Sequence, residues 1–353
     1  MKNVQSLRNA VMVSLLAGTT LVWGGTAFAQ EDLQEFALED MVVTATRTES
    51  KMVDVPVNTT VISAEKIADR HYLDVADALK DVPGATVLDT GVGAGEKKVV
   101  LNGDDRVLVL VDGKRVNFDM GAASGRSSYD LKMLPDVSLI ERVEVIKGHG
   151  GALYGSDAVG GVVNIITKKM DHSYGKVSMG FGSHQARDAK AMYTIKEGKT
   201  GVMVAASKYK QGYHEYKDAK TEANKRWPAA STYENEKVSV KLSQELSETS
   251  NLELGYDFSK FEGVRSYSTK AKSASFSNKK TNDFYAKYDW TVNDKDQGFI
   301  QLYRNKYDYY NAGDMYETDT GFEAQQNITL SDNNQLVVGA SYRKAKALNA
   351  TSY

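Results

Sequence analysis

The chain has no cysteine, only 4 prolines and 3 tryptophans, and no clear excess of charge of either sign. The absence of cysteine excludes disulfides, thiolate metal sites and a cysteine nucleophile, and it is compatible with an oxidising compartment. Lys and Arg (44) nearly balance Asp and Glu (46). This balance argues against a nucleic-acid-binding protein, which would normally show a clear basic excess.

Long apolar runs are also scarce. The longest lies near the N-terminus, from Ala10 to Trp23, behind the positive residues Lys2 and Arg8. It is shorter than the roughly 20 residues of a spanning helix, and Ala27-Phe28-Ala29 follows it as a small-x-small cleavage pattern. We therefore predict a signal peptide over 1–29, cleaved near Ala29, rather than a membrane anchor. Any membrane-spanning part of the remaining chain is then expected to be a β-barrel.

Residues 56–169 show the pattern of a small mixed α/β domain. Helices are predicted to begin at Ser63 and at Asp74. Asp112-Gly113 between two apolar stretches is a tight-hairpin signal. Short apolar runs predict strands at Thr59–Ile62, Val99–Leu101, Arg106–Val111, Ile140–Ile146 and Val159–Thr167.

From residue 170 on, segments of about ten residues alternate apolar and polar side chains, as in an outer-membrane barrel. Short turns alternate with predicted long loops near 211–231, 263–279 and 310–318. All four prolines lie outside these segments, as ladder hydrogen bonding requires. The pattern favours a β-barrel over a soluble β-sandwich. The apolar rows are Val202/Val204/Ala206, Val238/Val240/Leu242, Leu252/Leu254/Tyr256/Phe258, Phe284/Ala286/Tyr288/Trp290 and Leu336/Val338/Ala340/Tyr342, with polar residues such as Lys237, Ser239 and Lys241 between them.

The glycine-rich stretch Arg142–Lys168 does not fit a nucleotide site. After Gly148 and Gly150 a dinucleotide fingerprint needs a third glycine, where Leu153 stands, and no Gly-Lys-Ser/Thr follows. No Ser/His/Asp order or carboxylate pair suggests an enzyme. We predict no catalytic residue, no metal site and no cofactor, since the 5 histidines show no metal-ligand spacing; haem ligation by His149 or His214 stays a minor alternative.

The same stretch resembles the TonB-dependent outer-membrane receptors. Tyr154–Ala158 with Gly160–Thr167 is similar to the closing motif of their plug domain, and Arg106–Gly113 and Leu79–Gly84 to its central hairpin and early helix-turn. Asn102-Gly103 departs from the Arg-Gly of many relatives. The resemblance implies an α+β plug domain followed by an antiparallel transmembrane β-barrel, here incomplete, with about nine of the roughly 22 strands of plugged transporters.

The resemblance also identifies a TonB box at Met41, Val42, Val43, Thr44, Ala45 and Thr46. This β-prone segment has no obvious partner in its own chain, and the inner-membrane protein TonB would add to it as a strand. The expected order is signal peptide (1–29), periplasmic tail with the box (30–55), plug (56–169) and the N-terminal part of the barrel (170–353).

The implied function is import of a metal chelate (cobalamin, a siderophore or haem) across the outer membrane of a diderm bacterium, by a monomer embedded in outer-membrane lipid. Vitamin B12 receptors are similar in the compact form of the plug. A passive porin or adhesin and a soluble plug-like binding module remain as alternatives. Candidate substrate-binding residues lie in two plug segments: Gly93, Glu96, Lys97, Asn117, Phe118, Ser124, Arg126 and Tyr129.

Overall fold

The computed structural model describes residues 42–43, 50–51, 58–89, 96–119, 129–148, 154–155, 157–212, 214–217, 220–221, 224–227, 232–268, 273–293, 296–310, 314–331 and 334–349. All of them belong to one compact unit, Leu38–Tyr353. The predicted signal peptide lies outside the described residues. Within these ranges no helix has the length and apolarity needed to cross a membrane.

The first part of this unit is a small α/β domain. Its main sheet has the strand order β3-β8-β9-β6-β7, in which β6 and β9 are parallel and the other pairs antiparallel. A separate antiparallel pair joins β5 to β4, a strand that the sequence pattern did not predict. The elements are β3 (Asn58–Ser63), α2 (Ala64–Asp69), α3 (Val75–Leu79), β4 (Ala85–Asp89), β5 (Lys97–Leu101), β6 (Val107–Val111), β7 (Lys114–Arg115), η3 (Leu131–Met133), η4 (Val137–Leu139), β8 (Ile140–Lys147) and β9 (Gly161–Thr167).

Capping and turn residues determine where these elements begin and turn. The side chains of Ser63 and Asp74 each accept a hydrogen bond from a backbone N–H in the first turn of α2 and α3. Asp112 and Gly113 have positive φ (50° and 80°), which a two-residue hairpin turn between β6 and β7 requires. The predicted helix starts and the predicted hairpin are confirmed.

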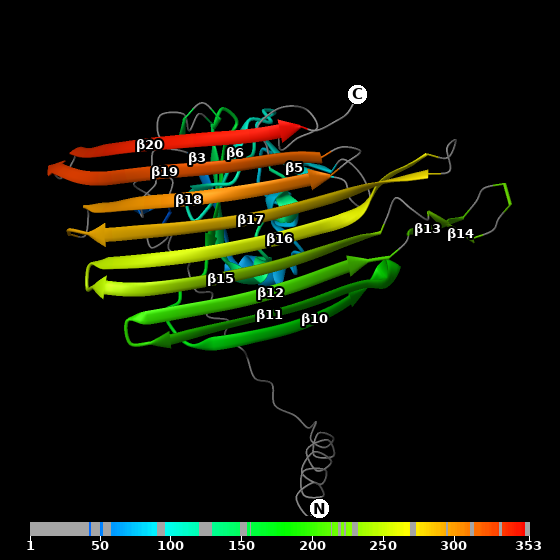
Figure 1. Ribbon diagram of the computed structural model, residues 1–353, viewed down its shortest axis with the longest axis horizontal. Helices are drawn as coiled ribbons and strands as arrows, with labels where there is room; N and C mark the ends of the chain where they lie inside the picture. The colour runs from blue at the N-terminus through cyan, green and yellow to red at the C-terminus, as the bar shows by residue number, and fades with distance from the viewer. Residues whose placement is uncertain are drawn as a thin grey trace, which may run out of the picture. The chain divides into compact units, whose positions relative to one another are not determined.

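The second part is an antiparallel sheet of nine described strands that follow one another in chain order (Figure 1). The predicted fold class and the count of about nine barrel strands are confirmed. The 3-10 helix η5 (Ser183–Gln185) joins the first two strands. The strands are β10 (Tyr174–Gly182), β11 (Ala186–Glu197), β12 (Thr200–Gln211), β15 (Tyr233–Ser247), β16 (Ser250–Ser268), β17 (Ser273–Thr291), β18 (Gln297–Tyr310), β19 (Asp314–Ser331) and β20 (Asn334–Asn349).

The predicted long loops are wrong in extent. β16 runs to Ser268 and β17 starts at Ser273, so most of 263–279 is paired strand. Likewise β19 starts at Asp314, within 310–318. Between β12 and β15, β13 (His214–Lys217) and β14 (Asn224–Trp227) form their own hairpin. These stretches lack regular apolar alternation, yet the ladder continues because its hydrogen bonds join backbone groups.

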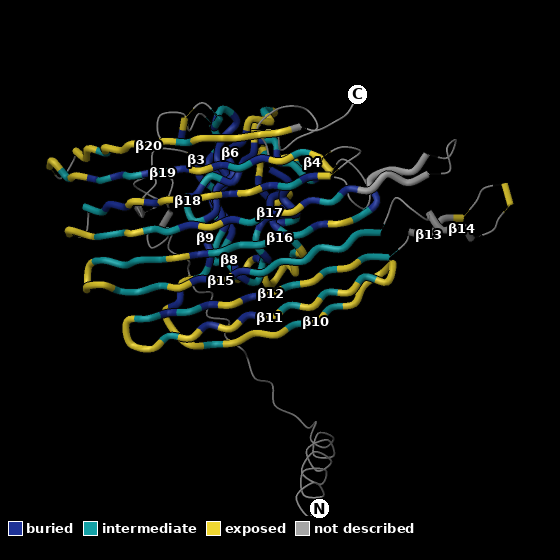
Figure 2. Tube along the Cα trace, in the orientation of Figure 1, coloured by how far each residue is buried: buried dark blue, intermediate teal, exposed yellow. Residues whose placement is uncertain are grey.

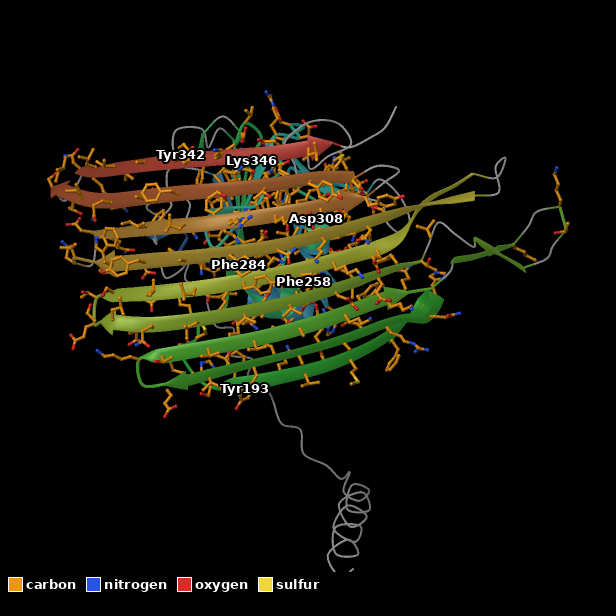
Figure 3. All side chains as sticks on the ribbon, in the orientation of Figure 1. Tyr193, Phe258, Phe284, Asp308, Tyr342 and Lys346 are labelled. Atoms are coloured by element: carbon orange, nitrogen blue, oxygen red, sulfur yellow. The ribbon has the colours of Figure 1, made fainter. Side chains whose placement is uncertain are left out.

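The two faces of the nine-stranded sheet differ in polarity. Large apolar side chains of the predicted rows are exposed on one face, and Figure 3 shows Tyr193, Phe284 and Tyr342 there. Figure 2 shows buried and exposed residues alternating along the strands. Apolar outside and polar inside is the alternation of an outer-membrane barrel. Polar residues of β15–β17 are buried on the opposite face, among them Ser239, Lys241, Ser259, Thr281 and Asp283.

The α/β domain and the sheet share one hydrophobic core. Phe261 of β16 and Tyr307 and Tyr309 of β18 belong to the same buried cluster as Leu79 and Val163 of the domain. Phe118 of the domain stacks on Tyr307 with ring centroids 4.7 Å apart. We call the face of the sheet that packs on the domain the wall.

A row of paired residues crosses the wall from strand to strand: Lys241, Gly255, Tyr285, Tyr303, Gly321 and Arg343. A Cβ on Gly255 would lie 2.0 Å from a ring carbon of Tyr285, and one on Gly321 would lie 2.0 Å from a ring carbon of Tyr303. Each tyrosine ring therefore lies across the glycine of the neighbouring strand and covers its bare backbone.

Replacing Gly255 with alanine is expected to displace the Tyr285 ring and to destabilise the sheet by roughly 1–3 kcal/mol, the range for overpacking. The measurement is the denaturant midpoint of the full-length protein in detergent. Gly180→Ala in β10 is the matched control, because the nearest atom to a Cβ there is 3.5 Å away. The penalty should vanish in a Tyr285→Ala background; an equal penalty in both backgrounds would contradict the steric explanation.

Candidate functional site

The β-prone segment near the N-terminus has a partner within the chain. β1 (Val42–Val43) pairs antiparallel with β2 (Ser50–Lys51). The sequence shows no obvious partner for this segment, because backbone groups can pair with any nearby extended stretch whatever its side chains. An isolated two-stranded ladder is marginally stable, so another strand can replace β2. Met41, Thr44, Ala45 and Thr46 lie outside the described residues.

A buried cluster of charges joins the domain to β17. Nζ of Lys279 lies 2.7 Å from Oδ2 of Asp130 and 3.1 Å from Oε1 of Glu96. The exposed fractions of these three side chains are 0%, 2% and 6%. The backbone N–H of Lys97 donates to Oδ1 of Asp130 (3.1 Å). Removing one charge would leave its partners buried and uncompensated, so loss of any one of the three groups is expected to loosen the contact between the domain and the wall.

The pKa of Asp130 reflects this setting. Burial alone would raise it, but the positive charges of Lys279 and Lys132, with hydrogen bonds from Lys279 and from the Lys97 backbone, bring the pKa below its usual value. A carboxyl whose pKa is lower when folded stabilises the folded state above its unfolded pKa. It loses that contribution as the pH falls through the folded-state pKa.

Asp130→Asn is expected to destabilise the docked domain by roughly 3 kcal/mol at neutral pH. The difference from the wild type should shrink as the pH falls below about 4, the ordinary Asp pKa, and vanish below the folded-state pKa. Hydrogen exchange at residues 129–134 of the full-length protein measures it. A difference that does not change with pH would show that the Asp130 charge is unimportant.

A second buried cluster holds the β6–β7 turn. Nζ of Lys241 in β15 lies 2.6 Å from Oδ2 of Asp112 and also donates to Oγ1 of Thr167. Asp112 in turn accepts hydrogen bonds from the backbone N–H and the hydroxyl of Thr167, both at 2.8 Å. Lys241 is 3% exposed. One wall lysine thus fixes both the hairpin turn and the end of β9.

Other polar contacts spread over the wall. Lys190 of β11 lies 3.3 Å from Asp136, and Arg343 of β20 lies 3.0 Å from Asp119. Nδ2 of Asn305 in β18 donates to the backbone carbonyl of Arg115 (2.8 Å). Strands from β11 to β20 therefore hold the domain at separate polar points as well as through the shared core.

The predicted substrate-binding residues that are described lie in or beside these contacts. Glu96 joins the Lys279 cluster, and Lys97 pairs with Asp74 (2.7 Å). Asn117 accepts from the backbone N–H of Val109 (2.6 Å) and donates to the carbonyl of Val107. Phe118 and Tyr129 are buried and stacked on each other, 6.0 Å between centroids. Gly93, Ser124 and Arg126 lie outside the described residues, and the assignment of the whole set to a ligand stays a prediction.

The sequence pattern did not point to the wall cations that hold the domain. The alternation puts Lys241 in a polar row between Val240 and Leu242, but nothing in the row shows which group it meets. Lys279 lies in a stretch predicted to be loop. A lysine on the inward row of a barrel strand is the signal that could have marked them. Among the residues that the structure describes, no group of three or more His, Asp or Glu side chains could hold a metal ion.

A family model described as the TonB-dependent receptor plug domain matches residues 51–162. The vitamin B12 transporter BtuB of Vibrio vulnificus is 41% identical over 182 residues, covering 50% of this chain and 29% of that protein. The iron-regulated outer membrane virulence protein of Vibrio cholerae serotype O1 is 42% identical over 163 residues, covering 46% of this chain and 24% of that protein. These names are of a transporter and a virulence protein of the outer membrane, in agreement with the prediction of a non-enzyme.

Solved structures match the fold over more of the chain. The ferripyoverdine receptor of the Pseudomonas aeruginosa outer membrane, bound to ferripyoverdine, has a TM-score of 0.68 at 16% identity and covers 96% of this chain and 50% of that one. The structure of the FpvAI–pyocin S2 complex also has a TM-score of 0.68 at 16% identity, covering 87% and 46%. The chain spans about half the length of these proteins, and the likeness includes both the small domain and the nine-stranded sheet.

Proposed function

Since this chain belongs to the TonB-dependent receptors of the outer membrane, we propose that the protein that carries it imports a scarce metal chelate into the periplasm. The observation that carries the proposal is a plug domain docked on the polar inner face of an antiparallel sheet, with buried charge clusters at Lys279 and Lys241. A passive porin or an adhesin needs no such domain. A soluble plug-like module needs no sheet with an exposed apolar face, which we assign to outer-membrane lipid.

The energy for import would come from TonB acting on the segment Met41–Thr46. Support comes from β1, because the two-residue ladder between Val42–Val43 and Ser50–Lys51 can be exchanged for a strand of the partner. A pull on this segment would reach the plug. Polar plug–wall contacts can be replaced by contacts with water, which suits a domain that has to move within a hydrated lumen.

The cargo is a cobalt or iron chelate. One relative is named a vitamin B12 transporter and another an iron-regulated protein, and one similar structure holds ferripyoverdine. The plug segments around Glu96–Lys97 and Asn117–Tyr129 are the proposed ligand-facing parts, and Gly93, Ser124 and Arg126 are included in the proposed set. We place the receptor in the outer membrane as a monomer, after cleavage near Ala29.

The test is a binding screen of the full-length receptor in detergent against cobalamin, haem and common siderophores. We expect saturable binding of one of these classes, followed by uptake that requires TonB in cells. A receptor that binds none of them, or whose uptake persists without TonB, would overturn the proposal.

A further inference from the structure

Two cavities lie between the plug and the wall, and both are lined by residues of β15–β17, one cavity beyond the other along these strands; the larger also extends to β11, β18 and β19. The larger holds about 570 Å³ and is lined by wall residues near the short turns, such as Ser243 and Lys287. The smaller holds about 20 Å³ and is lined by wall residues further from those turns, such as Ser239 and Thr281. The smaller is large enough for one water molecule.

Each cavity contains a buried polar atom with no hydrogen-bond partner among the described residues. In the smaller cavity it is Oδ1 of Asp283, and in the larger it is Nε2 of Gln301. Buried polar atoms are nearly always satisfied by protein or by ordered water. These two atoms therefore mark places for water or for polar groups of a passing solute.

The row Lys241–Gly255–Tyr285 separates the two cavities. Asp112 of the hairpin turn lines the larger cavity, and Lys114, two residues later, lines the smaller. Lys241 binds Asp112 and Thr167 at this level. The Tyr285 ring lies beside them, with Nζ of Lys114 5.0 Å and Nζ of Lys241 5.6 Å from its centroid.

We propose that the inward face of β15–β17 is the route by which the solute passes the plug, and that the Lys241–Asp112 ion pair is the latch that closes this route at rest. The proposal rests on the import function proposed above. The solute it fits is polar and rich in hydrogen-bonding groups, since hydroxyls, carboxylates and amines line both cavities.

The position of the latch distinguishes it from the other plug–wall ion pairs. Lys279 with Asp130, and Lys190 with Asp136, line neither cavity. Breaking Lys241–Asp112 would release the turn that separates the cavities and join them. Breaking Lys190–Asp136 would loosen the plug elsewhere and leave the row between the cavities in place.

The test uses the purified full-length receptor in planar bilayers with KCl, so that K⁺ and Cl⁻ are the probes and neither TonB nor a chelate is present. Lys241→Met removes the charge while keeping much of the side-chain length. We expect its mean conductance to exceed that of the wild type by at least about tenfold, because loss of a buried partner shifts the population toward the open arrangement. Lys190→Met, the matched control, should stay at the wild-type conductance.

Three results would overturn the latch. One is a folded Lys241→Met receptor that stays closed. Another is equal leakage from Lys190→Met, which would mean general loosening of the plug. If Lys241→Met fails to fold, charge reversal decides between the two explanations. Each single reversal, Asp112→Lys or Lys241→Asp, should leak, and the double variant should be closed because the ion pair is restored. A leaking double variant is the third contrary result. If the conductance results support the latch but the receptor binds no chelate in the screen, only the import function is overturned.

Discussion

Replacement of Val43 by proline in the full-length receptor is expected to abolish TonB-dependent uptake while ligand binding persists. Proline has no backbone N–H and fixes φ, so it cannot donate a ladder hydrogen bond to an added strand. A penalty of about 3 kcal/mol for such a misfit corresponds to more than about a hundredfold in affinity for the partner. Ligand binding should not change, because Val43 lies before the plug in the chain.

The comparison of uptake with equilibrium binding of the same labelled chelate measures this effect. Val43→Thr is the conservative control, since threonine keeps the N–H and the β preference. Ser50→Pro removes the internal partner strand β2 without touching the segment Met41–Thr46, and should leave uptake intact. Unchanged uptake in Val43→Pro would refute the TonB role, and an equal loss in Ser50→Pro would assign the effect to the internal ladder.

Alanine at position 161 is expected to prevent the plug from closing its sheet. Gly161 is the first residue of β9 and has a φ of +141°. A Cβ added there would lie 2.3 Å from the carbonyl oxygen of Ile146 in β8. That oxygen belongs to the neighbouring strand of the same sheet, so it cannot retreat without disturbing the β8–β9 ladder. Strain and overlap together should destabilise the plug by roughly 3 kcal/mol or more.

Limited proteolysis of the full-length receptor measures the loss, as faster cleavage within residues 58–167. Gly103→Ala is the matched control: Gly103 also has positive φ (+84°), but a Cβ there would meet nothing within 4 Å. It should cost only the left-handed backbone conformation, roughly 1–2 kcal/mol. If both variants are digested at the same rate, the contact with Ile146 is not the cause.

Local signals predicted much of the plug. Ser63, Asp74 and the Asp112-Gly113 turn act within a few residues of themselves, so the helix starts and the hairpin could be recognised without the rest of the fold. The glycine-rich closing motif was the main basis of the resemblance to the TonB-dependent receptors. β4 was missed because Ala85–Asp89 has only five residues and none of them is fully buried, so the strand shows no strong core-facing row.

The barrel strands were predicted where one face is apolar. Val238, Val240 and Leu242 stand out because polar residues alternate with them along β15. The strand ends near Ser268 and Asp314 carry no such alternation, so the pattern predicts loops there although their backbones stay paired.

The charge clusters could not be predicted because they join residues far apart in the chain. Lys241 meets Asp112 across 129 positions, and Lys279 meets Asp130 across 149. A lysine in an inward polar row could form an ion pair with any of many carboxylates. Only the docking of the plug on the wall determines which carboxylate it meets.

The core shared by Phe261, Tyr307 and Tyr309 with the plug has a consequence for biogenesis. These aromatic rings come from β16 and β18, so the plug reaches its full burial only when those strands stand beside it. Insertion of the strands and ordering of the plug are therefore coupled steps. Until the wall stands beside it, the plug exposes the part of its apolar surface that these rings cover, and such exposed surface favours aggregation.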